Sequence, residues 1–247
     1  MNKLELYRRK TRNYFRQKSF ARKSGASNFK LLPGWLIKQQ SIDSSYQSQC
    51  GQDWFVDKFV FPDLETGIFV DVGANHPVEI NNTFYFEKKG WSGIAFEPQK
   101  ELAQLWSSER KSVCLPFVLG DQEKDIVFNV SEEAHTLSSV CEGMSLANSP
   151  ASTIYKQRRL DTLLIESGIN HVDFLSIDVE GYEIHVLQGL DFQKVNVVCL
   201  VLENDKTKFG DDAIRTHMHD WGYRHVARLS GDDVFVKIKS DAEKRFL

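Results

Sequence analysis

Residues 68–98 read IFVDVGANHPVEINNTFYFEKKGWSGIAFEP, and this stretch decides the fold of the chain. Residues 68–72 are apolar apart from one acid, which is typical of a parallel strand buried on both faces. Gly73 then permits a turn and a close approach to a ligand, a helix follows, and residues 93–96 form a second strand that ends on Glu97. This order of strand, glycine turn, helix, strand and acid predicts an α/β unit that binds a nucleotide-like cofactor.

Two acids at the tips of these strands are the first candidates for the site. Asp71 lies in a buried strand, where a carboxylate is costly unless a partner such as a ligand ammonium group pairs with it. Glu97 ends the second strand and can accept hydrogen bonds from two ribose hydroxyls. Together with Gly73, Ala74 and Asn75 of the turn, they form the predicted cofactor site. The alternative is that both acids cap helices or form salt bridges in an ordinary α/β domain.

The residues that are missing narrow the choice of cofactor. A dinucleotide site uses GxGxxG to seat a pyrophosphate at a helix N-terminus, whereas Gly73 is followed here by Ala-Asn-His-Pro. The GxxxxGK[ST] motif does not occur either, which excludes a P-loop. A cofactor with an adenosine and an amino-acid tail but no phosphate fits Asp71 and Glu97 better, and S-adenosylmethionine is that cofactor. Asp121 follows the third predicted strand and is a further candidate, near the adenine.

Five segments occur in an order that is similar to a known family. They are SQCGQD (48–53), FVDVGANHPV (69–78), NNTFYFEKKGWSGIAFEP (81–98), LDTL (160–163) and DFLSIDVEGYEIHVLQGL (173–190). In this order they resemble the FkbM-type S-adenosylmethionine-dependent methyltransferases, over roughly residues 47–236. The resemblance implies a seven-stranded methyltransferase sheet with an antiparallel strand near the C-terminus. It also implies O-methylation of a hydroxyl on a sugar, polysaccharide or natural product.

The rest of the chain fits the same α/β class. Helical patterns separate most of the strand candidates, and this alternation predicts a doubly wound sheet in one domain, residues 47–247, after a basic extension and linker, residues 1–46. Besides residues 68–72 and 93–96, the strand candidates are 113–118, 126–130, 174–177, 197–202, 224–228 and 234–238.

Acids at two further strand tips are candidates for catalysis, because ligands of doubly wound sheets bind beyond the carboxyl ends of the strands. Asp178 follows residues 174–177 and Glu203 follows residues 197–202. If the two strands are neighbours, about 4.8 Å apart, these acids can act on one acceptor or hold one Mg²⁺ or Mn²⁺ ion. A hydroxyl acceptor needs a base, and Asp178, Glu180 and His76 are the candidates. For Glu180 the alternative is a helix-start acid, and for His76 an ordinary loop residue.

Charge is spread unevenly along the chain. Its formal net charge is -3, yet residues 1–30 contain ten Lys or Arg and the single acid Glu5. This tail predicts either contact with an anionic membrane surface or polymer, or a solvated extension. No nucleic-acid module accompanies it, so nucleic acid is not an expected partner. Four cysteines without a CxxC pair, and no long apolar segment, predict a cytoplasmic protein that is at most peripheral to the membrane.

Two other classes remain open at this point. A glycosyltransferase shares acidic clefts and saccharide substrates, and a non-catalytic Rossmann-like module binds adenosine ligands without turnover. The pair Asp232 and Asp233 is reminiscent of a glycosyltransferase metal motif, but a hairpin turn at Gly231 explains these acids without chemistry.

Overall fold

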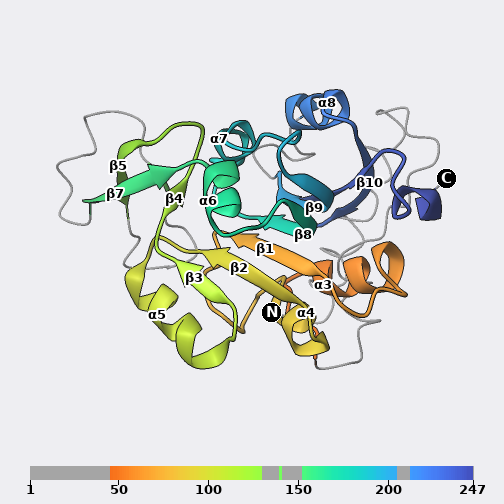
Figure 1. The fold of residues 1–247 in the computed structure, drawn as a ribbon, viewed down its shortest axis with the longest axis horizontal. Coiled ribbons are helices and arrows are strands. Elements are labelled where there is room, and N and C mark those ends of the chain that lie inside the picture. Colours follow the sequence, from red (N-terminus) through yellow and green to blue (C-terminus); the bar gives the residue numbers. More distant parts are fainter. Residues whose placement is uncertain (1–44, 130–138, 141–151, 205–211, 247) are drawn as a thin grey trace, which may run out of the picture.

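The computed structural model describes residues 45–129, 139–140, 152–204 and 212–246 (Figure 1). Its centre is a seven-stranded sheet in the order β10-β11-β9-β8-β1-β2-β3. From β9 to β3 every pair of neighbours is parallel, whereas β11 runs antiparallel to both β9 and β10. The doubly wound Rossmann-like sheet expected from the resemblance is therefore confirmed. Its strands are β1 Ile68–Val72, β2 Ser92–Phe96, β3 Val113–Leu115, β8 His171–Ile177, β9 Asn196–Glu203, β10 Tyr223–Leu229 and β11 Asp232–Lys237.

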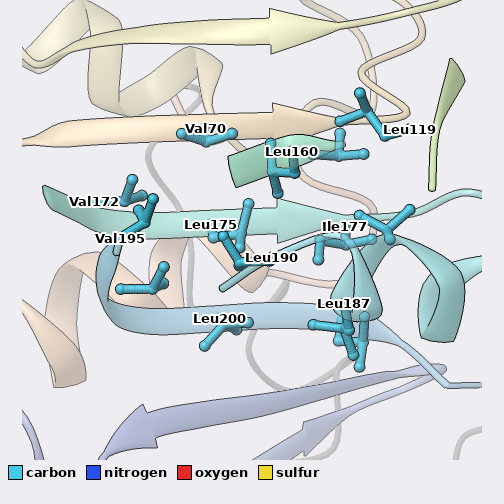
Figure 2. Packing of buried hydrophobic residues seen from close by; sticks show 14 of the residues in the cluster. Val70, Leu119, Leu160, Val172, Leu175, Ile177, Leu187, Leu190, Val195 and Leu200 are labelled. Atoms are coloured by element: carbon cyan, nitrogen blue, oxygen red, sulfur yellow. The ribbon is translucent and has the colours of Figure 1, made fainter. Parts of the chain in front are cut away.

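Both faces of the sheet are covered by apolar side chains. On one face, Val70, Leu175 and Leu200 of three adjacent strands pack with helices α6 and α7 (Figure 2). Helix α8 belongs to the same apolar cluster. On the other face, Phe69 and Phe174 pack with α3, α4 and the C-terminal turn. Burial on both faces explains why the central strands are nearly continuous apolar runs. The helices are α3 Gln52–Phe55, continued by a π-helical segment Val56–Val60, α4 Phe84–Lys89, α5 Lys100–Glu109, α6 Leu160–Glu166, α7 Glu183–Gln188, α8 Asp212–Asp220 and a final 3-10 turn Glu243–Phe246.

A second, four-stranded sheet was not predicted. It has the order β4-β7-β5-β6 and consists of β4 Val118–Leu119, β5 Lys124–Asn129, β6 Ser139–Val140 and β7 Ser152–Arg158. The single strand predicted for residues 113–118 is therefore wrong: Pro116, which has no N–H to donate, separates β3 from β4, and the two strands belong to different sheets. The strand predicted at 126–130 corresponds to β5, which lies in the second sheet.

The segment after Gly73 also differs from the prediction. No helix starts at the turn; α4 begins only at Phe84, and residues 74–83 form an irregular loop. Gly73 has a φ of 73°, and a Cβ at this position would lie 1.8 Å from the backbone oxygen of Asp178. The glycine is thus required by the neighbouring strand end, besides lying at the ligand-facing edge of the sheet.

The N-terminal prediction falls largely outside the described residues, which begin at residue 45. Tyr46 already packs against the domain, because its ring stacks on Tyr85 at 4.1 Å and its hydroxyl donates to Asp57 at 2.6 Å. Among the residues that the structure describes, no helix is long and apolar enough to cross a membrane.

Candidate active site

A cavity of about 590 Å³ lies at the carboxyl ends of β1, β2, β8 and β9, next to β4 of the second sheet. This is the edge where ligands of doubly wound sheets bind. It brings together the predicted site residues Asp71, Gly73, Ala74, Asn75, His76, Glu97, Asp178, Glu180 and Glu203. Further lining residues that the sequence reasoning missed are Gln49, Asn81, Asn82, Gln99, Phe117, Val118, Leu119, Ser176 and Tyr182.

Glu97 is held rigidly at the tip of β2. Its Oε2 accepts a hydrogen bond from the Asn75 backbone N–H at 2.9 Å, and its Oε1 accepts one from the Gln99 N–H at 2.8 Å. Burial raises the pKa of Glu97, the two backbone hydrogen bonds act in the opposite direction, and the charge of Asp71 adds to the rise. Each carboxylate oxygen has a second lone pair, so Glu97 can still accept hydrogen bonds from a ligand in the cavity.

Asp71 is paired within the protein, so a ligand ammonium group is not its required partner. Its Oδ2 accepts hydrogen bonds from the Thr83 hydroxyl at 2.7 Å and from the Asn81 amide at 3.1 Å. Among the described residues no hydrogen bond ends on Oδ1. Asp71 therefore lines the cavity with one oxygen fixed by the protein and the other available to a ligand.

Asn81 organises the loop between β1 and α4. Its amide nitrogen lies within hydrogen-bonding distance of the carbonyl oxygens of Ala74 and His76, at 3.2 and 3.3 Å, and its Oδ1 accepts from the N–H groups of Thr83 and Phe84. A side chain that joins both ends of a loop restricts its conformations. The signal for this role was present in the NNT segment of the resemblance, but local patterns do not show where an amide points.

The carboxyl groups of Asp178 and Glu203 lie side by side at the tips of β8 and β9, close enough to affect each other's ionisation. Asp178 is open to the cavity, yet the protein around it displaces enough water to raise its pKa well above the ordinary value, and the negative charges of Glu203 and Asp232 add to this. Burial and the neighbouring acids likewise raise the pKa of Glu203 to about 7. Two carboxyl groups so close cannot both ionise readily, so the pair holds one proton as a unit.

The structure separates the roles of two acids in the turn before α7. Glu183 accepts hydrogen bonds from the backbone N–H groups of Gly181 at 2.8 Å and Val179 at 3.3 Å, so it is the acid that stabilises the turn. Glu180, at a φ of 53°, lines the cavity instead. Burial and the charge of Glu183 raise the pKa of Glu180.

The SQCGQD segment reaches the cavity from the N-terminal side. Asp53 is buried and accepts hydrogen bonds from the backbone N–H groups of Gln47, Ser48 and Trp54, at 2.6, 3.1 and 2.7 Å. This fixes a turn that presents Gln49 to the cavity. Gln52 donates a hydrogen bond to Asp232, which links the same segment to the acids at the tips of β8 and β9.

Asp232 does more than terminate a hairpin, which corrects the interpretation from the sequence. The turn consists of Ser230 and Gly231, and Asp232 lies in β11 opposite Glu203, where its charge raises the pKa of both Asp178 and Glu203. Asp233 next to it is buried and bound by Arg215, Arg228 and other donors, so its role is structural.

Two predicted residues are placed differently from expectation. Asp121 does not line the described part of the cavity; it follows β4 in the second sheet, and its Oδ1 accepts a hydrogen bond from Gln157 at 3.4 Å. The adenine role expected for it rested on a third strand that continues to residue 118, which the structure does not have. His76 lines the cavity, but its Nδ1 accepts backbone N–H groups of Val78 at 3.2 Å and Glu79 at 2.9 Å. These bonds occupy the lone pair that a neutral imidazole needs to act as a base.

A metal site is not evident in the described part of the chain, which contains no group of three or more His, Cys, Asp or Glu arranged to hold an ion. Asp178 and Glu203 are the two carboxylates that face each other in the cavity.

Comparison with known proteins agrees with this geometry. No curated protein matches the chain. The family described as Methyltransferase FkbM domain matches residues 71–225, more than half of the chain. This range begins at Asp71 and includes Glu97, Asp178 and Glu203, the acids at all four strand tips of the cavity. The chain therefore belongs to the FkbM methyltransferase family.

Proposed function

We propose that the protein transfers the methyl group of S-adenosylmethionine to a hydroxyl group of a sugar, polysaccharide or natural product. One observation carries the proposal: a single cavity contains the rigidly held carboxylate of Glu97 and the proton-sharing pair of Asp178 and Glu203. The first suits a ribose, and the second suits removal of a proton from an acceptor. The volume of the cavity, about 590 Å³, is in the range of cavities that bind small molecules and cofactors.

The cofactor end fits S-adenosylmethionine in chemistry. Glu97 would accept hydrogen bonds from the ribose hydroxyls, and the Oδ1 oxygen of Asp71 would accept one from the ammonium group. Apolar side chains of Phe96, Phe117 and Leu119 offer a surface for the adenine. When bound, S-adenosylmethionine supplies a methyl group activated by the positive charge on sulfur.

The other end of the cavity fits a hydroxyl acceptor. Gln49 and Asn82 line the same cavity as Asp178 and Glu203, and their amide groups can hydrogen-bond to hydroxyls. When the pair has lost its shared proton, it can take the proton of the acceptor hydroxyl as the methyl group is transferred. Holding the acceptor oxygen in line is the other contribution that these residues make.

A bound metal ion is the alternative role of Asp178 and Glu203. The same two carboxylates are oxygen ligands of the kind that Mg²⁺ and Mn²⁺ prefer. We favour the base role because burial and the neighbouring acids raise the pKa of both carboxyl groups, which suits them to accept a proton from a hydroxyl near neutral pH.

The basic residues 1–30 add a second, separate part to the proposal. Ten cations and one acid favour weak attachment to an anionic membrane surface or polymer. Co-sedimentation with anionic vesicles of the full chain, and of a chain that lacks residues 1–30, tests this part without affecting the first.

Isothermal titration of the protein with S-adenosylmethionine, S-adenosylhomocysteine, NAD and a UDP-sugar tests the cofactor. We expect the first two to bind and the others not to bind. Binding of the UDP-sugar alone would instead support a glycosyltransferase, and cofactor binding without transfer to any acceptor would support a binding module. Mass spectrometry of cellular glycans with and without the gene then identifies the acceptor, by the loss of a methyl group.

A further inference from the structure

Arg110 is a buried arginine directly behind the wall of the cavity. It follows α5 and is 7% exposed, and it does not belong to the cavity lining that the structure describes. Its guanidinium stacks on the ring of Trp106 at 4.3 Å and lies 5.4 Å from the ring centre of Phe69. Burying a guanidinium group is costly unless its N–H groups form hydrogen bonds or ion pairs within the protein.

The donors of Arg110 converge on the loop that forms the cofactor end of the cavity. Nη1 donates to the carbonyl oxygen of Pro77 at 2.8 Å and to Oδ1 of Asn81 at 3.2 Å. Nη2 donates to the hydroxyl oxygen of Thr83 at 3.2 Å. On its other side, Nε lies 3.2 Å from a carboxylate oxygen of Glu87, which anchors the guanidinium to α4.

Two of these acceptors, Thr83 and Asn81, are also hydrogen-bonded to Asp71. Thr83 and Asn81 each receive a hydrogen bond from Arg110 and each donate one to Oδ2 of Asp71. Arg110 and Asp71 are therefore joined through two side chains rather than by direct contact. The same bonds determine the rotamers of Thr83 and Asn81, since a side chain that both accepts and donates has one orientation that satisfies both.

Arg110 also acts on Asp71 by its charge. The titratable groups that face Asp71 are Arg110, Glu97 at the end of β2, and the thiol of Cys114 in β3. Burial raises the pKa of Asp71 and the positive charge of Arg110 opposes this rise. Arg110 thus favours the ionised form of a carboxylate that lines the cavity.

We propose that Arg110 is a positioning residue for cofactor binding, which orients the carboxylate of Asp71 and the loop of residues 74–83 through Asn81 and Thr83. The proposal rests on the proposed function, because it concerns the same cavity. It assigns to a residue outside the cavity a part of the affinity for the sulfonium cofactor. It also explains why an arginine is needed here: a lysine carries the charge but lacks the planar fork that reaches Pro77, Asn81 and Thr83 together.

The test compares three variants of the full chain with the wild type. Arg110→Met removes charge and fork, Arg110→Lys keeps the charge, and Thr83→Val breaks one link to Asp71 while keeping its shape. Arg228→Met is the matched control, because Arg228 is 3% exposed and bound to Asp233, away from the loop of residues 74–83. The measurements are Tm and the Kd for S-adenosylhomocysteine as a function of pH.

We expect Arg110→Met and Thr83→Val to weaken binding by about tenfold, the effect of losing one charge-assisted hydrogen bond to a ligand. Arg110→Lys should have a smaller effect. In Arg110→Met the loss of binding at acid pH should begin at a higher pH than in the wild type, and Arg110→Lys should restore the wild-type midpoint. Arg228→Met should lower Tm and leave Kd and midpoint unchanged.

A wild-type Kd in both Arg110→Lys and Thr83→Val would overturn the proposal, even if Arg110→Met fails to fold. An equal change of Kd in Arg228→Met would also overturn it, because the effect would then follow from stability alone. Failure of the proposed function would give a different result, because the wild type itself would then not bind S-adenosylhomocysteine.

Discussion

Asp178 and Glu203 follow paired residues at the ends of two adjacent parallel strands, and their carboxyl groups lie close enough to affect each other's ionisation. The register pairs Ile177 with Leu202, so the two acids are the next residues on neighbouring strands and must lie side by side. Asp232 pairs with Glu203 from the other side and adds a third negative charge. This crowding of acids raises the pKa of both carboxyl groups, so that the pair, once it has lost a proton, is a stronger base than an ordinary carboxylate.

Asp178→Asn should lower turnover by about 10²–10⁴-fold, because it keeps the size of the side chain and removes the basic oxygen. Affinity for the cofactor should change little, since β1 lies between β8, which Asp178 follows, and β2, which Glu97 follows. Asp125→Asn is the control: Asp125 is exposed in the second sheet and pairs with Lys156. Near wild-type turnover in Asp178→Asn would show that the base lies elsewhere, with Glu180 the next candidate.

If the pair of Asp178 and Glu203 acts as a base, chelation should leave turnover unchanged, because transfer of a proton to a carboxylate needs no cation. The measurement is initial methyl-transfer rate before and after dialysis against EDTA, followed by addition of Mg²⁺ or Mn²⁺. Loss of activity that either ion restores would contradict the base role and assign the pair to a metal.

Turnover should rise with pH and level off above about 7, the raised pKa of Glu203, because the pair must lose its shared proton before it can accept another.

The contribution of Glu203 to the stability of the fold should decrease as pH rises. A carboxyl group whose pKa is higher in the folded state binds more protons there, so its contribution is complete below the unfolded pKa of 4.5 and is lost as pH rises through about 7.

Urea unfolding of the wild type and of Glu203→Gln, measured from pH 4.5 to about pH 7, separates the contribution of Glu203 to stability from that of other titratable groups. We expect the wild type to lose stability relative to the variant as pH increases. A gain in relative stability over the same interval would mean that the folded protein lowers, rather than raises, the pKa of Glu203.

Glu97→Ala should weaken S-adenosylmethionine binding by tenfold or more, since each charge-assisted hydrogen bond to a hydroxyl contributes about 1.5–3 kcal/mol. Glu97→Gln is the milder companion, because its amide can still accept one backbone N–H. Calorimetry measures the affinity for S-adenosylmethionine. An unchanged Tm would show that the loss of affinity does not come from unfolding after the hydrogen bonds from Asn75 and Gln99 are lost. Unchanged affinity in both variants would remove Glu97 from the cofactor site.

Gly73→Ala should lower the free energy of unfolding by about 2–4 kcal/mol, because the new Cβ meets the Asp178 carbonyl and the backbone is left-handed. Gly168→Ala is a close control, since Gly168 has the same φ of 73° and a Cβ there meets nothing within 4 Å. It should cost only about 1–2 kcal/mol, the penalty of the left-handed conformation. Equal losses in urea unfolding would show that the tips of β1 and β8 are not in tight contact.

Local patterns in the sequence were sufficient for the strands that are buried on both faces. Residues 68–72, 174–177 and 197–202 are apolar runs because each of their faces meets a core, and this property is visible without knowledge of the neighbours. In the second sheet such patterns located β5, but they did not predict the sheet itself or the strand β7. Strand β7, Ser152–Arg158, alternates without a clear apolar face, and its partners come from distant parts of the chain.

The sequence by itself determined which acids end the strands, Asp71, Glu97, Asp178 and Glu203, because a charged residue that interrupts or follows an apolar run is conspicuous. Only the tertiary structure decided what each acid meets. Asp71 is paired by Thr83 and Asn81, with Arg110 behind them, and Asp232 joins the pair of Asp178 and Glu203 through an antiparallel register. The physical reason is that hydrogen bonds and carboxylate repulsion act over a few ångströms in space, between residues that are far apart along the chain.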